Sequence, residues 1–184
     1  CRWVNVNYII NDDTIACIKQ GLSVSGYGEI CLKIISCLVR RGMPPENKAQ
    51  LIQLFDIPTQ IQQISGAFAN DNKLAWAASD LVNYTGQALL LLQRPEVEQY
   101  FPIAIEFFSF PDPITSLSVV PFLTSLCKAN PAVFQVITEK LIERLCIYFA
   151  NVQSRPNQDS FLDDLIPLEK TIVNVTKQEQ GNAA

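Results

Sequence analysis

The stretch VRRGMPPENKAQLIQLF, from Val39 to Phe55, indicates how the chain folds. An apolar helical pattern ends there in two arginines and a glycine, and after two prolines a second helical pattern begins. Arginines in a last turn suit the negative end of the helix dipole, and glycine readily adopts the left-handed conformation that closes many helices. Proline is well tolerated at the first position of a new helix. The stretch therefore predicts two helices joined by a tight turn.

The same helical spacing extends along almost the whole chain. Ile30, Ile34 and Leu38 recur every four residues, and a longer apolar stripe runs from Leu74 to Leu92. This spacing is typical of helices, because strands would alternate apolar and polar residues. The predicted helices span residues 12–22, 26–41, 45–68, 71–93, 95–109, 113–128, 131–151 and 159–177.

Capping residues and prolines support these boundaries. Asn11-Asp12-Asp13, Asp112-Pro113 and Asn130-Pro131 place capping side chains before expected helix starts. Three prolines fall inside helical patterns, and we expect them to kink or split their helices: Pro102, Pro121 and Pro167.

Taken in order, the helices form four antiparallel pairs. Pair starts near residues 12, 45, 95 and 131 are separated by 33, 50 and 36 residues, and their average of about 40 is close to the repeat length of HEAT and armadillo proteins. Several helices are apolar on more than one face, as in Phe101–Phe110, and stacked repeats require this. The pattern favours an all-α solenoid of HEAT-like helix pairs, an ARM-type superhelix, over a closed helical bundle. We expect residues 1–184 to be a single block of about four pairs, a fragment of a larger protein.

The composition excludes several classes of function. Apolar residues make up 48% of the chain, the net charge is −4 and the pI is about 4.8. An acidic balance is not typical of a free-standing nucleic-acid binder, although it leaves room for a local basic patch. The chain contains no histidine, which removes Ser-His-Asp and Cys-His catalysis and His-ligated zinc.

Cysteines, glycines and paired acids give no sign of catalysis. The cysteines form no C-x-x-C pair, so zinc has no support from spacing. Gly26-Tyr27-Gly28 lacks the features of a phosphate-binding loop, and Asp12-Asp13 and Asp163-Asp164 lie where helices begin and suit capping. We therefore predict no enzyme activity, no catalytic residue, no metal and no cofactor. Five cysteines are expected to be reduced and buried, as in a cytosolic or nuclear protein: Cys17, Cys31, Cys37, Cys127 and Cys146.

The best basic cluster combines Arg40 and Arg41 with Lys33 on the same helix and Lys48 across the turn. One interpretation is helix-terminal charge that also aids solubility. The other is contact with RNA phosphate or with an acidic partner surface. We name these four residues as candidate RNA or partner contacts.

Three segments resemble the exportin-t family, the importin-β-like karyopherins that export tRNA, and a fourth, at residues 102–122, is similar to its later repeats more weakly. RWVNVNYIIND, at residues 2–12, is similar to a short helical segment of nuclear exportins. Within residues 31–55, Gly42-Met43, Pro45, Lys48 and Leu51 match a family pattern in register. LAWAASDLVNYTGQALL, at residues 74–90, shares a core with the family at Leu81, Val82, Asn83, Gly86 and Gln87.

The resemblance implies a non-catalytic nuclear export receptor that shuttles between nucleus and cytoplasm. Such a carrier is a long HEAT superhelix that wraps tRNA together with Ran-GTP, and contacts with nuclear pore proteins are also implied, without a membrane partner. An exportin for another RNA or protein cargo, and a helical-repeat scaffold that binds only protein, remain alternatives.

Overall fold

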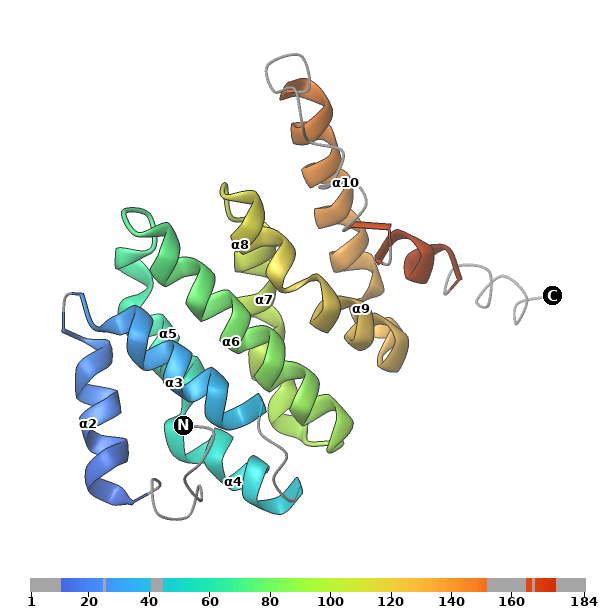
Figure 1. The fold of residues 1–184 in the computed structure, drawn as a ribbon. Helices are drawn as coiled ribbons and strands as arrows, with labels where there is room; N and C mark the ends of the chain where they lie inside the picture. The colour runs from blue at the N-terminus through green and yellow to red at the C-terminus, as the bar shows by residue number, and fades with distance from the viewer. Residues whose placement is uncertain (1–10, 25, 41–44, 152–164, 167, 175–184) are drawn as a thin grey trace.

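The computed structural model describes residues 11–24, 26–40, 45–151, 165–166 and 168–174 (Figure 1). Within these ranges every regular element is a helix, as the spacing predicted. The α-helices are α2 (Asp12–Leu22), α3 (Gly28–Arg40), α4 (Pro45–Phe55), α5 (Ile57–Ile64), α6 (Asn72–Leu91), α7 (Tyr100–Phe108), α8 (Pro113–Ser118), α9 (Val120–Ala129) and α10 (Phe134–Asn151). Short 3-10 helices are η1 (Ser65–Ala67), η2 (Pro95–Gln99) and η3 (Pro131–Val133). Residues 165–166 and 168–174, inside the predicted helix 159–177, are also helical.

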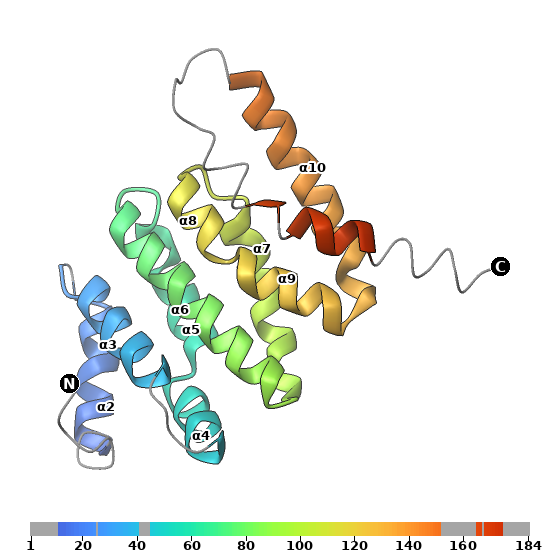
Figure 2. The same cartoon turned by 45° about the vertical axis from the view of Figure 1, so that its right-hand side comes forward.

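The helices lie in two layers (Figures 1 and 2). One layer contains α3, α6 and the α8–α9 segment side by side, and α6 contacts each of the others. Behind them, α2 packs against α3 and α5, while α7 packs against α6, α8 and α9. Helix α10 follows and contacts α7 and α9. Among consecutive helices, α2 therefore packs on α3, and α7 packs on both α6 and α8.

Side-chain caps set several of the helix starts. The Oδ1 atom of Asn11 accepts the backbone N–H of Thr14 at 2.8 Å at the start of α2. Asp112 does the same for Thr115 at 2.9 Å at the start of α8. These bonds satisfy first-turn N–H groups that have no partner within the helix, and they confirm the capping role predicted for Asn11 and Asp112.

The structure corrects the prediction of one continuous helix over residues 45–68. Asp56 adopts the left-handed conformation, with φ 47° and ψ 55°, and separates α4 from α5. Pro58 lies in the first turn of α5. In an uninterrupted helix its ring would clash with the carbonyl of Leu54, four residues earlier, so the chain starts a new helix instead.

Three other predicted helices are also divided, and the one expected at 131–151 begins as the 3-10 helix η3. The helix expected at 113–128 splits at Val119, two residues before Pro121, which lies in the first turn of α9; this is the split predicted for that proline. The helix expected at 95–109 begins as the 3-10 helix η2, and Pro102 lies in the first turn of α7 rather than at a kink. Pro167 lies outside the described residues.

Helix α6 lies at the centre of the hydrophobic core. Ala75, Ala78, Leu81 and Val82 on this helix are fully buried, and their positions cover more than one face. Small side chains allow neighbouring helices to approach closely. The central position of α6 makes it the element against which the neighbouring helices are aligned.

The cysteine prediction was correct for only part of the described set. Cys31 and Cys127 are buried, whereas Cys17, Cys37 and Cys146 are exposed, and all five are free thiols. Cys37 shares the outward face of α3 with Lys33 and Arg40, because these positions are spaced by one helical turn each. Among the described helices, none combines the length and the apolar character needed to cross a bilayer.

Candidate functional site

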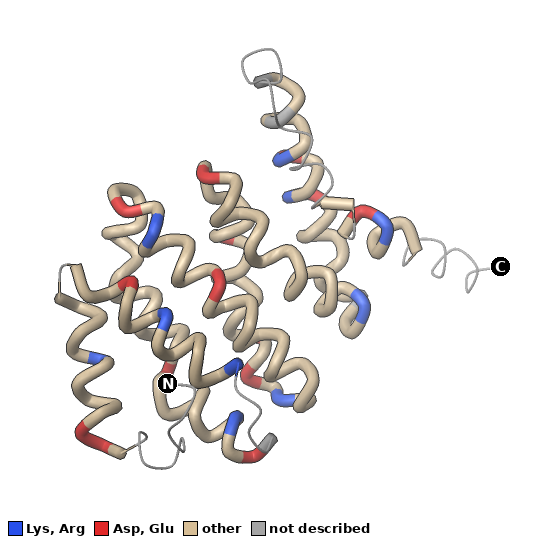
Figure 3. Tube along the Cα trace, in the orientation of Figure 1, with Lys and Arg blue, Asp and Glu red and all other residues tan. Residues whose placement is uncertain are grey.

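The structure places the described members of the predicted basic cluster on two adjacent helices. Lys33 and Arg40 are exposed and lie two turns apart on α3. Lys48 is partly buried on α4, which packs against α3. Arg41 lies outside the described residues. Figure 3 shows the Lys and Arg positions interspersed with Asp and Glu along the helices.

Both cations on α3 lie over aromatic rings of α6. The Nζ atom of Lys33 is 5.3 Å from the centre of the Trp76 ring and also pairs with Glu29. The Cζ atom of Arg40 is 4.0 Å from the centre of the Tyr84 ring. A cation over an aromatic ring contributes about 0.5–1 kcal/mol at an exposed site. Lys33 and Arg40 therefore hold α3 against α6, in addition to any contact that they make with a partner.

Asp80 lies one turn from Trp76 and one turn from Tyr84 on the same face of α6. Burial raises the pKa of its carboxyl group, and the nearby charge of Arg40 partly opposes that rise. Within the described residues, Asp80 has no hydrogen bond and no ion pair. A half-buried carboxylate without a partner is costly in the folded state.

These α6 residues line one wall of a groove of about 730 Å³ between α6 and the α8–α9 segment, helices that lie side by side in Figures 1 and 2. The α8–α9 wall combines apolar and hydroxyl side chains. The apolar ones include Ile114, Leu117 and Pro121, and the hydroxyl ones are Ser118, Thr124 and Ser125. The α6 wall consists of Trp76, Asp80, Asn83, Tyr84 and Gln87.

Asn83 joins the two walls of this groove. Its side chain is 6% exposed, and its Oδ1 atom accepts the backbone N–H of Phe122 at 3.0 Å and Nε2 of Gln87 at 2.8 Å. Phe122 lies in the first turn of α9, where backbone N–H groups have no partner within the helix. Next to this bond, a Cβ on Gly86 would lie 2.7 Å from the Phe122 ring, so the absence of a side chain allows α6 and α9 to approach.

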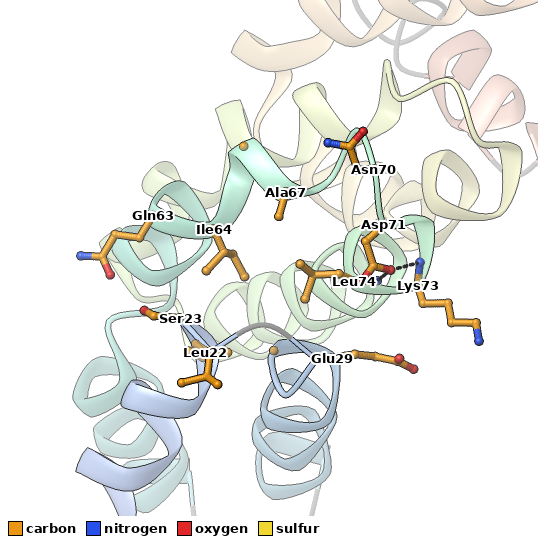
Figure 4. Close-up of a pocket in the computed structure, with 14 residues that line it drawn as sticks. Leu22, Ser23, Glu29, Gln63, Ile64, Ala67, Asn70, Asp71, Lys73 and Leu74 are labelled. Carbon is orange, nitrogen blue, oxygen red and sulfur yellow. Dashed lines mark hydrogen bonds between the residues drawn. The ribbon is translucent and has the colours of Figure 1, made fainter.

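A second cavity, of about 580 Å³, lies between the α2–α3 turn and the start of α6 (Figure 4). Its acids already have partners. Asp71 accepts the backbone N–H groups of Lys73 and Leu74 at 3.1 and 3.0 Å, and Glu29 pairs with Lys33. Figure 4 shows Ile64 and Leu74 directed toward the space between the helices, while Gln63 extends away from it. The arrangement is that of a helix cap beside a packing gap, and it lacks a free acid–base pair among the described residues.

Among the described residues, no metal-binding cluster is found and the two buried cysteines are not activated thiols. No three His, Cys, Asp or Glu side chains in those residues gather closely enough to hold a metal ion. Burial raises the pKa of the Cys31 and Cys127 thiols, which is the opposite of what an activated nucleophile requires. A cavity of about 200 Å³ near Asp56 and Tyr100 is smaller than most ligand sites.

The groove was not predicted from the sequence, although its α6 wall lies within the stretch at residues 74–90 that resembles the exportin-t family. Asn83, Gly86 and Gln87 were considered only as points of family resemblance, and Trp76 appeared only within the quoted stretch at residues 74–90. A buried asparagine inside an apolar helical stripe was the available signal, because a buried amide needs hydrogen-bond partners.

Comparison with known proteins gives one informative similarity. The chain is 24% identical over 144 residues to Exportin-T of Scheffersomyces stipitis, an alignment that covers 71% of this chain. It covers 14% of that relative, so the chain spans only a small part of the relative's length. No family model matches the chain. The similarity suggests an exportin-like helical repeat.

Proposed function

We propose that this chain is a segment of a nuclear export receptor that carries tRNA out of the nucleus together with Ran-GTP. The observation that carries the proposal is the similarity to Exportin-T over 71% of the chain. The packing of α2 on α3 and of α7 on α8 supports it, because antiparallel helix pairs are the unit of a HEAT-type solenoid. In this proposal residues 1–184 form one block of about four pairs in a longer superhelix.

A receptor of this kind binds and releases its cargo without catalysing a reaction and shuttles between nucleus and cytoplasm. The proposal assigns Lys33, Arg40, Arg41 and Lys48 to contact with RNA or a partner. Arg40 is exposed while its guanidinium lies over Tyr84. A stacked guanidinium has fewer conformations to lose when it binds a phosphate. The two roles of Arg40 are therefore compatible.

The test measures the binding of labelled mature tRNA to the full-length protein that contains this chain. Binding is measured with and without GTP-locked Ran, at two salt concentrations. We expect binding that requires Ran and weakens at higher salt, because phosphate contacts release counterions. The Arg40→Ala/Arg41→Ala double variant should weaken binding and reduce the salt dependence. Lys128→Ala, which removes an exposed cation from the last turn of α9, is the matched control. Absence of tRNA binding in all conditions would contradict the proposal.

A second candidate is an exportin-like or scaffold protein whose cargo is protein alone. The observation that favours it is the groove along α6, where Asp80 is the only charged residue among the described lining side chains. A surface for RNA phosphate would carry cations there instead. In the binding experiment, tRNA would then fail to bind under every condition.

A further inference from the structure

The α6 wall of the groove carries a row of polar groups that have no partner in the described residues. Besides the Asp80 carboxylate, Nδ2 of Asn83 donates to no group and Oε1 of Gln87 accepts from none. On the opposite wall the buried hydroxyl of Thr124 also lacks a partner in the described part of the chain. The Thr124 hydroxyl is fully buried, whereas the Asp80, Asn83 and Gln87 groups of the α6 wall are the ones available for hydrogen bonds to a ligand.

The Asn83 amide is held in one orientation. Its Oδ1 atom accepts two hydrogen bonds, one from Phe122 and one from Gln87, which leaves its Nδ2 as the donor for a ligand. Gln87 uses its Nε2 in the same pair, which leaves its Oε1 as an acceptor. A fixed donor and an acceptor one helical turn apart match the C=O and N–H groups that every peptide backbone presents.

The length of the row suits an extended chain. The groove residues of α6 run from Trp76 to Gln87, over which a helix rises about 16 Å. A peptide in extended conformation advances about 3.3 Å per residue, so about five residues would span the wall. The helix of a partner would be too wide to bring its own backbone groups, already paired internally, to these atoms.

The charge in the groove selects the side chain of the ligand. Asp80 is the only charged group among the described lining residues. Lys33 is paired with Glu29, and Arg40 lies over Tyr84 on the α3 side. A phosphate backbone in the groove would be repelled by the Asp80 carboxylate, whereas a lysine or arginine would pair with it. The stem of such a side chain could pack on Ile114, which is 67% exposed.

We propose that the groove between α6 and the α8–α9 segment binds an extended peptide of a partner protein, with a lysine or arginine of that peptide against Asp80. Asn83 and Gln87 bind the peptide backbone. Asp80 provides the preference for a basic side chain. This inference does not depend on tRNA being a cargo.

The test is a peptide array probed with the fluorescently labelled chain. Each peptide has one fixed central residue, varied through all amino acids, and randomised flanks. We expect peptides with central lysine or arginine to bind about tenfold or more tightly than those with alanine, as charge-assisted hydrogen bonds allow. Asp80→Asn should abolish that preference. Glu98→Gln, which removes an exposed acid of η2, should leave it unchanged.

A second variant separates recognition of the backbone from recognition of charge. Gln87→Met should weaken all peptides by a similar factor and keep the preference for lysine and arginine. Circular dichroism and thermal unfolding identify any variant that fails to fold. The proposal is overturned if the unmodified chain shows no preference for basic residues or if Asp80→Asn retains it. Tighter binding of oligouridine to Asp80→Asn than to the unmodified chain, without a basic preference in the array, would assign the groove to nucleic acid instead.

Discussion

The Oδ1 atom of Asn83 on α6 accepts the backbone N–H of Phe122 on α9 at 3.0 Å, although the two residues are 39 positions apart in the chain. The bond satisfies a first-turn N–H of α9 that the helix itself cannot satisfy. It therefore links the register of one helix to the start of another.

Replacing Asn83 should show how much this link contributes to stability. We expect Asn83→Leu to lower the free energy of unfolding by about 1–3 kcal/mol, because the N–H of Phe122 would be buried without a partner. Asn83→Asp keeps an acceptor oxygen at the positive end of α9, so its free energy of unfolding should fall by less. Urea unfolding of both variants measures the difference. Equal losses would indicate that the amide acts through packing alone.

Gly86 should tolerate no side chain. A Cβ at this position would lie 2.7 Å from the Phe122 ring, so Gly86→Ala should destabilise the fold by about 1–3 kcal/mol through overpacking. Gly66→Ala is the control, because a Cβ there meets nothing within 4 Å. Thermal unfolding should show a lower Tm for the first variant only. The double variant Gly86→Ala/Phe122→Leu should lose less stability than the sum of the losses in the two single variants, because the added Cβ would no longer meet the Phe122 ring.

The contact between Arg40 and Tyr84 should be measurable as a coupling energy. A double-mutant cycle with Arg40→Ala and Tyr84→Leu is expected to give about 0.5–1 kcal/mol, since the guanidinium lies 4.0 Å from the ring centre at an exposed site. The same cycle between Lys19 and Tyr84 serves as the reference, because no contact joins those residues. A coupling of zero for Arg40 would show that the stack adds no stability.

Asp80 should make stability depend on pH. Burial raises the pKa of its carboxyl group in the folded state, so the folded state holds its proton at pH values where the unfolded state has released it. Asp80 therefore lowers the free energy of unfolding increasingly as pH rises from its pKa in the unfolded state to its pKa in the folded state. Above the folded-state pKa this loss of stability is complete. Asp80→Asn should be more stable than the parent near neutral pH, and this advantage should disappear below about pH 3.9. Urea unfolding across this range checks the sign.

Gln93 offers a stabilising change. It adopts φ 52° just after Leu92, the C-cap residue of α6. The N–H of Gln93 bonds there to the carbonyl of Leu90, and that of Arg94 to the carbonyl of Leu89. This is a Schellman end, in which glycine is the favoured residue. Gln93→Gly should raise the free energy of unfolding by about 0.5–1 kcal/mol, because glycine avoids the steric cost of the left-handed conformation. A decrease would mean that the Gln93 side chain makes a compensating contact.

The sequence allowed the class of fold to be predicted, because helical spacing and caps are local. Asn11 and Asp112 cap the helices that they were expected to cap. The break at Asp56 was missed, since apolar spacing on both sides of one left-handed residue still looks helical. Pro58 was the overlooked signal.

The groove depends on contacts that are distant in the chain and was beyond local reasoning. The packing of α3 on α6 places Lys33 over Trp76 and Arg40 over Tyr84. Residue spacing within one helix does not reveal such contacts between helices. The negative charge of the groove could not be predicted for the same reason. Asp80 lies in the middle of an apolar helix, and only the packing of α8 and α9 shows that it faces a cavity.

The locked amide of Asn83 also provides the molecule with its own spectroscopic reporter. Because the Asn83 oxygen is held by two donors and the residue lines the groove, the two side-chain amide protons occupy different surroundings. In a ¹⁵N-labelled sample they form one pair of signals that belongs to the groove alone. Any occupant that accepts a hydrogen bond from that nitrogen would shift this pair, so occupancy could be followed without attaching a dye to the protein.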